Sequence, residues 1–161
     1  MIITFCGHST YCPSSEDERK LLQFFEERIG DRPAEFFLGG YGSFDSFARS
    51  CAAKYKRTHP NVRLILVTPY ITPSYQKTHL EYARELYDEI LYPELESVPP
   101  RYAITYRNRY MVEKADVVVA YIVCRTSGAY ETYRHAVRKK KEIFYIQETK
   151  LSERSAPRRP A

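Results

Sequence analysis

Short apolar runs alternate with segments of helical periodicity along most of this chain. The runs at 62–68 and 116–123 are almost continuously apolar and too short for amphipathic helices. Runs of this kind are typical of parallel strands that helices cover on both faces. The pattern therefore predicts one α/β domain, in which a mostly parallel, twisted sheet lies between two layers of helices.

Glycine and proline residues separate the predicted elements. The predicted strands are 2–6, 34–38, 62–68, 116–123 and 142–146, the predicted helices are 15–29, 44–57, 76–88, 101–114 and 128–140, and 72–75 is a predicted turn. Residues 89–92 fit either a short strand or the end of the preceding helix. We expect 1–147 to form the folded domain and 148–161 to form a basic, disordered tail.

The formal net charge is +5, and its distribution argues against nucleic-acid binding. Residues 150–161 contribute +3 through four basic side chains and one acidic one, so the rest of the chain carries about +2. No run approaches the roughly 20 apolar residues of a membrane span, and residues 1–5 have the pattern of a strand rather than of a secretory signal. The four cysteines are scattered. We therefore expect a cytoplasmic protein with reduced thiols and with neither a metal site nor a resident cofactor.

Three glycines lie between a predicted strand and a predicted helix in the segment 36–45. Glycine allows a sharp turn and leaves room for phosphate oxygens to approach backbone N–H groups. Because the start of a helix also attracts anions, this corner is suited to phosphate; a tight turn without a ligand is the alternative. The residues concerned are Gly39, Gly40, Tyr41 and Gly42, with Ser43 as the predicted helix cap and Asp45 in the first helical turn.

Asp45 has two interpretations. It complements the helix dipole, or it binds a ribose hydroxyl or neighbouring glycine N–H groups. Two further segments follow predicted strands and are expected at the same edge of the sheet. They are Gly7, His8 and Ser9 after the first strand, and Ser127, Gly128 and Ala129 after the apolar run 116–123. His8 is interpreted either as a structural hydrogen-bond partner or as a residue that contacts the ligand or acts as a catalytic acid or base.

Polar and charged side chains in two predicted helices complete the candidate site. Arg107, Asn108 and Arg109 are interpreted as phosphate- and base-binding groups, because the fork of an arginine binds phosphate in a bidentate manner; a solvated turn of helix is the alternative. Glu131 follows the second glycine-bearing corner. It either acts on a bound ribosyl group or complements the dipole of its helix.

Several motifs, in this order, resemble the YpsA-type branch of the SLOG superfamily. That superfamily joins Rossmann-like proteins related to DprA and to the Lonely Guy phosphoribohydrolases. The matching segments are 4–9, 39–45, 64–70, 107–112, 115–116 and 127–130, so the resemblance spans nearly all of residues 1–147. It implies a Rossmann-like fold and a site for a nucleotide or a nucleotide-derived ligand, either ADP-ribose-like or a nucleoside monophosphate.

The resemblance leaves two functions open. One is a sensor or regulatory protein that binds the nucleotide-like ligand through both glycine-bearing corners. The other is hydrolysis of the N-glycosidic bond of a nucleoside 5'-monophosphate, with Arg107 and Glu131 in the catalytic roles. The loop 127–131 has one glycine where the Lonely Guy loop has three, so Glu131 corresponds only approximately. Members of the superfamily often dimerise, which makes a homo-oligomer an expectation of the resemblance and not of the composition.

Overall fold

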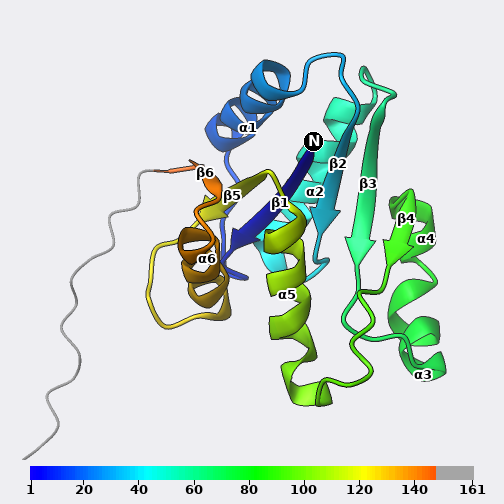
Figure 1. Ribbon diagram of the computed structural model, residues 1–161. Helices are drawn as coiled ribbons and strands as arrows, with labels where there is room; N and C mark the ends of the chain where they lie inside the picture. Colours follow the sequence, from blue (N-terminus) through cyan, green and yellow to red (C-terminus); the bar gives the residue numbers. More distant parts are fainter. Residues whose placement is uncertain (148–161) are drawn as a thin grey trace, which may run out of the picture.

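The computed structural model describes residues 1–147, which form a six-stranded sheet with helices on both faces (Figure 1). Every strand is parallel to its neighbours, in the order β4-β3-β2-β1-β5-β6. The strands are β1 (Ile2–Gly7), β2 (Ala34–Leu38), β3 (Val62–Val67), β4 (Glu89–Leu91), β5 (Val117–Tyr121) and β6 (Glu142–Tyr145). The predicted α/β domain with a parallel sheet is confirmed. The predicted tail, 148–161, lies outside the described residues.

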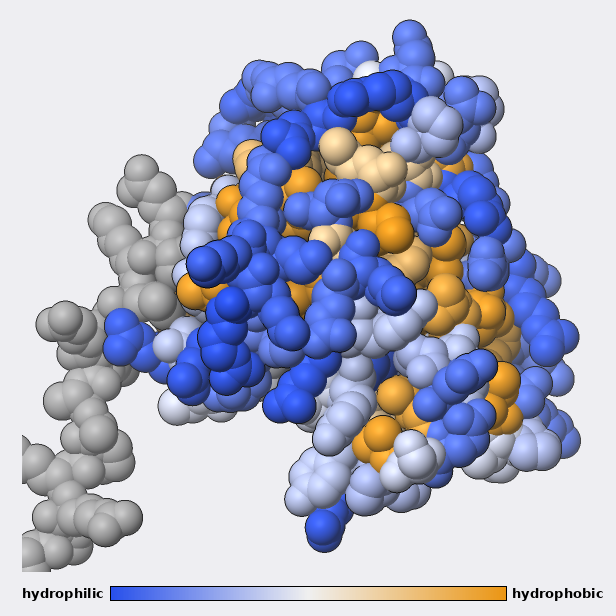
Figure 2. Space-filling view, in the orientation of Figure 1, coloured by the Kyte–Doolittle hydropathy of each residue, from blue (hydrophilic) through white to orange (hydrophobic). Residues whose placement is uncertain are grey.

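The helical segments divide between the two faces of the sheet. They are α1 (Ser15–Arg28), α2 (Gly42–Lys56), α3 (Pro73–Tyr75), η1 (Gln76–Leu80), α4 (Ala83–Leu86), η2 (Pro100–Tyr102), α5 (Ala103–Lys114) and α6 (Gly128–Arg138). Helices α1 and α2 pack on one face, and α5 and α6 cover the other (Figure 1). The surface seen over α5 and α6 is mainly hydrophilic, with smaller hydrophobic areas between the hydrophilic ones (Figure 2).

Strand β5 is apolar throughout because helices cover both of its faces. Val117 and Val119 pack into the core under α1 and α2, whereas Val118 and Ala120 pack against α5 and α6. Successive side chains of a strand point to opposite faces, so a strand covered on both faces needs an apolar residue at every position. All four of these side chains are fully buried.

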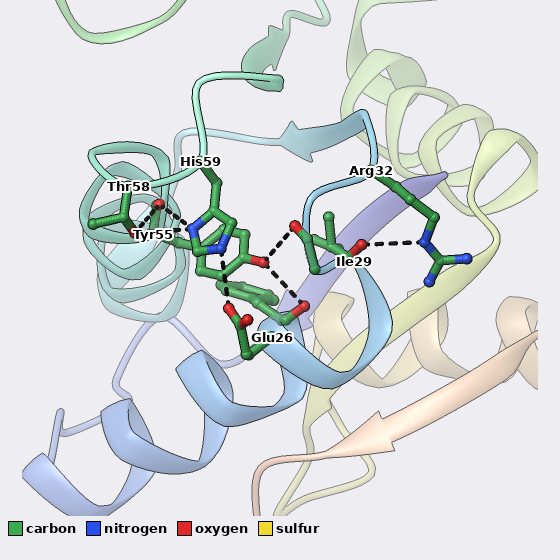
Figure 3. A network of polar contacts seen from close by, with 8 residues as sticks. Glu26, Ile29, Arg32, Tyr55, Thr58 and His59 are labelled. Carbon is green, nitrogen blue, oxygen red and sulfur yellow. Dashed lines mark hydrogen bonds and ion pairs between the residues drawn. The ribbon is translucent and has the colours of Figure 1, made fainter.

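A network of polar contacts joins the end of α1 to the end of α2 (Figure 3). The Tyr55 hydroxyl donates a hydrogen bond to the Gly30 carbonyl at 3.2 Å. The His59 ring stacks on Tyr55 with a centroid separation of 3.8 Å, and its Nε2 lies 3.0 Å from Glu26 Oε2. These contacts fix the helix layer on this face at the end of the sheet opposite to the carboxyl ends of the strands.

The predicted helix 76–88 is wrong in its extent. Thr72 caps a helix that begins at Pro73, continues through one π-helical turn in η1 and ends with α4. Tyr87 is extended, and β4 then pairs with β3, so the open alternative at 89–92 is resolved as a strand. The cause is Asp88: its N–H donates to the Leu64 carbonyl at 2.8 Å, and its Oδ2 accepts from the Leu64 N–H at 2.7 Å.

Among residues 1–147, no helix combines the length and the apolar character that crossing a bilayer requires. The same part of the chain holds no group of three His, Cys, Asp or Glu side chains placed to bind a metal ion.

Candidate functional site

A cavity of about 440 Å³ lies beyond the carboxyl ends of β1 and β5. This is the point where the order of the strands reverses, because β2 and β5 flank β1 on opposite sides. Open α/β sheets bind ligands at this position, and the volume is in the range of small-molecule sites. The lining residues are Phe5, Cys6, Gly7, His8, Ser9, Thr10, Tyr41, Asp45, Ile104, Arg107, Asn108, Met111, Val123, Cys124, Ser127, Gly128, Ala129 and Thr132.

The turn between β2 and α2 needs its glycines for its own shape. Gly40 and Gly42 have φ values of +70° and +85°, which only glycine adopts without strain. A Cβ atom on Gly42 would lie 2.8 Å from Cα of Ser9, so the turn and the loop after β1 are in direct backbone contact. Gly7 is equally crowded, since a Cβ there would lie 2.2 Å from Cγ of Phe44.

Two backbone N–H groups of this turn, those of Tyr41 and Ser43, are already used inside the protein. The Tyr41 N–H donates to Asp45 Oδ2 at 2.9 Å, and the Ser43 N–H donates to the Ser9 carbonyl at 3.1 Å. The helix cap is Tyr41 and not Ser43 as predicted, because the Ser43 hydroxyl donates instead to the Tyr11 carbonyl. Neither Ser43 nor Gly39, Gly40 and Gly42 lines the cavity. From this corner only Tyr41 and Asp45 reach it.

The corner between β5 and α6, unlike the glycines of the turn, lines the cavity. Ser127 caps α6, and its Oγ accepts from the Tyr130 N–H at 3.2 Å. Gly128 and Ala129 line the cavity, and a Cβ on Gly128 would meet nothing within 4 Å. Within residues 1–147, the N–H groups of Gly128 and Ala129 have no hydrogen-bond acceptor. The first turn of α6 therefore presents donors to the cavity, in the way that helix starts bind anions.

His8 holds this corner in place. Its Nε2 accepts from the Val123 N–H at 2.8 Å, which puts the proton on Nδ1, 3.1 Å from Ser127 Oγ. Burial lowers the pKa of His8, consistent with this neutral ring. Both ring nitrogens of His8 therefore have hydrogen-bond partners within the protein. These bonds agree with the structural interpretation of His8, although its ring also lines the cavity.

Arg107 is the buried cation of the site and comes from α5. Only 4% of it is exposed. Its Nη1 donates to the carbonyls of Gly39 at 2.9 Å and Val67 at 2.7 Å, and its Nε donates to Asn108 Oδ1 at 2.9 Å. Burial lowers the pKa of Arg107, while the charge of Asp45 opposes that change. Arg107 therefore joins the ends of β2 and β3 to the cavity wall.

Asp45 is the carboxyl group of the cavity. Burial raises its pKa to about 6, and the hydrogen bond from the Tyr41 N–H and the nearby charge of Arg107 reduce the rise. Of the two interpretations of Asp45, the hydrogen bond to a backbone N–H of the glycine turn is observed.

Besides Gly39, Gly40, Gly42 and Ser43, two further predicted site residues lie outside the cavity. Arg109 is exposed on α5, where its guanidinium lies over the Tyr106 ring. Glu131 is exposed on α6, with its carboxylate 3.6 Å from Arg134 Nη1. Helical geometry explains both, since a residue one or two positions from one that faces the cavity lies on another side of the helix. The lining residues that were not predicted from the sequence include Cys6, Ile104, Met111, Cys124 and Thr132. The first four of these form an apolar and sulfur-containing wall of the cavity. The spacing of Ile104, Arg107 and Met111 along one helix face was the signal that could have indicated part of it.

The sequence matches no protein-family profile and no curated protein. Solved structures do resemble it. DNA processing protein A (DprA) from Helicobacter pylori, described for its single-stranded DNA binding, aligns with a TM-score of 0.60 and 20% identity over 90% of this chain and 64% of its own. DprA from Streptococcus pneumoniae aligns with a TM-score of 0.61 and 16% identity over 92% of this chain and 51% of its own.

A molybdenum cofactor carrier protein from Chlamydomonas reinhardtii aligns with a TM-score of 0.52 and 14% identity. That match covers 89% of this chain and 74% of the carrier. The chain shares their Rossmann-like fold. At these identities the similarity is one of fold.

Proposed function

We propose that this protein binds a nucleotide or a nucleotide-derived ligand in the cavity beyond β1 and β5, as a sensor or regulatory protein of the YpsA type. The observation that carries the proposal is the pair of N–H donors at the start of α6, which have no acceptor among residues 1–147 and face a cavity of about 440 Å³. The size fits a nucleoside phosphate, and the donors fit its phosphate group.

The charges around the cavity support an anionic ligand. Arg107 supplies a buried positive charge, and a desolvated cation interacts more strongly with a phosphate than a solvated one does. Asp45, on the same wall, accepts a ribose hydroxyl when ionised and donates to it when protonated. Thus the phosphate belongs at the start of α6, and the sugar belongs between that helix and the Tyr41–Asp45 wall.

The position of Glu131 favours binding over the phosphoribohydrolase reaction. A carboxylate that stabilises a ribosyl centre must contact the ligand, and Glu131 is exposed beside Arg134 outside the cavity. The DNA binding described for the Helicobacter protein is not part of the proposal, since residues 1–149 carry only about +2 net charge.

Calorimetric titration with AMP, ADP-ribose, NAD and cyclic nucleotides tests the proposal. Gly128→Val is the informative variant, because Gly128 lines the cavity and a Cβ atom there meets nothing within 4 Å. We expect it to weaken binding at least tenfold at an unchanged melting temperature. Glu131→Ala, on the same helix but outside the cavity, is the matched control and keeps wild-type affinity. The proposal fails if none of these ligands binds below millimolar concentration.

A further inference from the structure

A second, smaller cavity of about 100 Å³ lies on the other side of the glycine turn. Its walls come from the turn itself, from the ends of β3 and α4, and from the α3–η1 segment. Five of its lining side chains are aromatic: Tyr41, Tyr75, His79, Tyr82 and Tyr87. The sequence contains 15 tyrosines, and four of them gather here.

The α3–η1 segment arranges its aromatic rings as a stack. Tyr75 and His79 lie one above the other, with ring centroids 4.4 Å apart and planes 10° apart. Tyr70 meets Tyr75 edge-on at 5.1 Å and supports it from behind. The π-helical turn in η1 follows Tyr75 directly. Single π-helical turns interrupt α-helices mostly at functional sites, because they cost helix stability.

The two cavities share a wall. Tyr41, Ile104 and Arg107 line both. Tyr41 is 76% exposed although its backbone is fixed by Asp45, so its ring is free to lie over a ligand that spans the turn. A ligand that has its phosphate at the start of α6 and extends past Arg107 would therefore reach residues of the second cavity.

The Tyr87 hydroxyl is a polar group of the second cavity that can bind the edge of a heterocycle. Burial raises the pKa of the Tyr87 hydroxyl to about 12, so it stays protonated and able to donate a hydrogen bond. Among residues 1–147, this hydroxyl has no hydrogen-bond partner, and the side chain is partly buried. A ring nitrogen or an exocyclic oxygen of a ligand would supply an acceptor for this hydroxyl.

We propose that the second cavity, lined by Tyr41, Tyr82 and the Tyr75–His79 stack, receives the aromatic base of the ligand. The proposal rests on the proposed function, since it assumes that the phosphate lies in the first cavity. Its volume, about 100 Å³ against about 440 Å³ for the first cavity, suits a part of the ligand rather than the whole. Aromatic side chains bind any base by stacking. The site therefore recognises a purine or pyrimidine ring rather than one particular base.

Comparison of AMP with ribose 5-phosphate tests this assignment, because the two ligands differ only in the base. We expect AMP to bind more tightly to the wild-type protein. Tyr82→Ala removes an exposed ring of the second cavity and reduces the ratio of the two affinities by roughly 5- to 150-fold, the range for loss of one base–aromatic stack. Tyr87→Phe removes the unpaired hydroxyl and lowers the same ratio.

Tyr106→Ala is the control, because this tyrosine is similarly exposed on α5 and lines neither cavity. The ratio stays at its wild-type value in this variant. If ribose 5-phosphate and AMP bind equally well, and Tyr82→Ala changes neither, the base does not enter the second cavity while the proposed phosphate site stands. If neither ligand nor any other nucleotide binds, the proposed function and this inference fall together.

Discussion

Gly42→Ala measures how far the fold, rather than a ligand, demands glycine in the turn between β2 and α2. Gly42 has a φ of +85°, and an alanine in the left-handed region costs about 1–2 kcal/mol. The new Cβ would lie 2.8 Å from Cα and Cβ of Ser9, and a backbone atom at that distance has to move. Movement of Ser9 weakens the bond from the Ser43 N–H to its carbonyl, which contributes about 1 kcal/mol.

These effects add to about 2–3 kcal/mol of lost stability. For a chain of this length each kcal/mol lowers the melting temperature by about 2–4 °C, so we expect a decrease of roughly 4–12 °C. Circular dichroism on ligand-free protein measures it. Gly128→Ala is the matched control: its Cβ meets nothing within 4 Å, so its melting temperature stays at or slightly above that of the wild type. Equal melting of Gly42→Ala and wild type would refute the argument that the fold imposes this turn.

Other variants probe the remaining groups of the site. Arg107→Met removes the donor from the buried Val67 carbonyl and the partly buried Gly39 carbonyl and costs about 2–4 kcal/mol in urea denaturation, whereas exposed Arg109→Met stays within about 0.5 kcal/mol. The pKa of Asp45 is about 6 in the folded state against 3.8 ordinarily, so the native protein holds a proton that the unfolded chain releases. Its contribution to stability therefore falls as pH rises from about 4 to 6, and Asp45→Asn removes that part of the pH dependence; identical profiles would contradict the assignment. Any release of adenine from AMP is unaffected by Glu131→Gln, because Glu131 lies outside the cavity; loss of release would restore the hydrolase mechanism.

The layered fold was predictable because the signal is local. In β5 every residue is apolar, and only a strand covered on both faces makes that arrangement favourable. Strand β4 was not predictable in the same way, since three residues are too few to show a period. It is defined by the two hydrogen bonds between Asp88 and Leu64, residues that lie 24 positions apart in the sequence.

The candidate site was only partly predictable, for a related reason. The sequence indicated that the loop after β1 and the corner before α6 lie at one edge of the sheet, and both do line the cavity. Which N–H groups remain free depends on partners distant in the sequence, such as the Ser9 carbonyl that accepts from Ser43. The tyrosine cluster has the same origin: Tyr41 and Tyr82 meet at one cavity only because β2 and β3 are adjacent in the sheet.

A glycine between a strand and a helix therefore has two different uses, and the space around its missing Cβ distinguishes them. At Gly7 and Gly42 that space is filled by Phe44 and Ser9, so the fold itself excludes a side chain. At Gly128 the space is open and belongs to the cavity, so the fold tolerates a side chain there and only a ligand would exclude it. Because the three glycines of the turn do not line the larger cavity, the expected phosphate contact moves to the start of α6, where the N–H groups of Gly128 and Ala129 have no acceptor among residues 1–147.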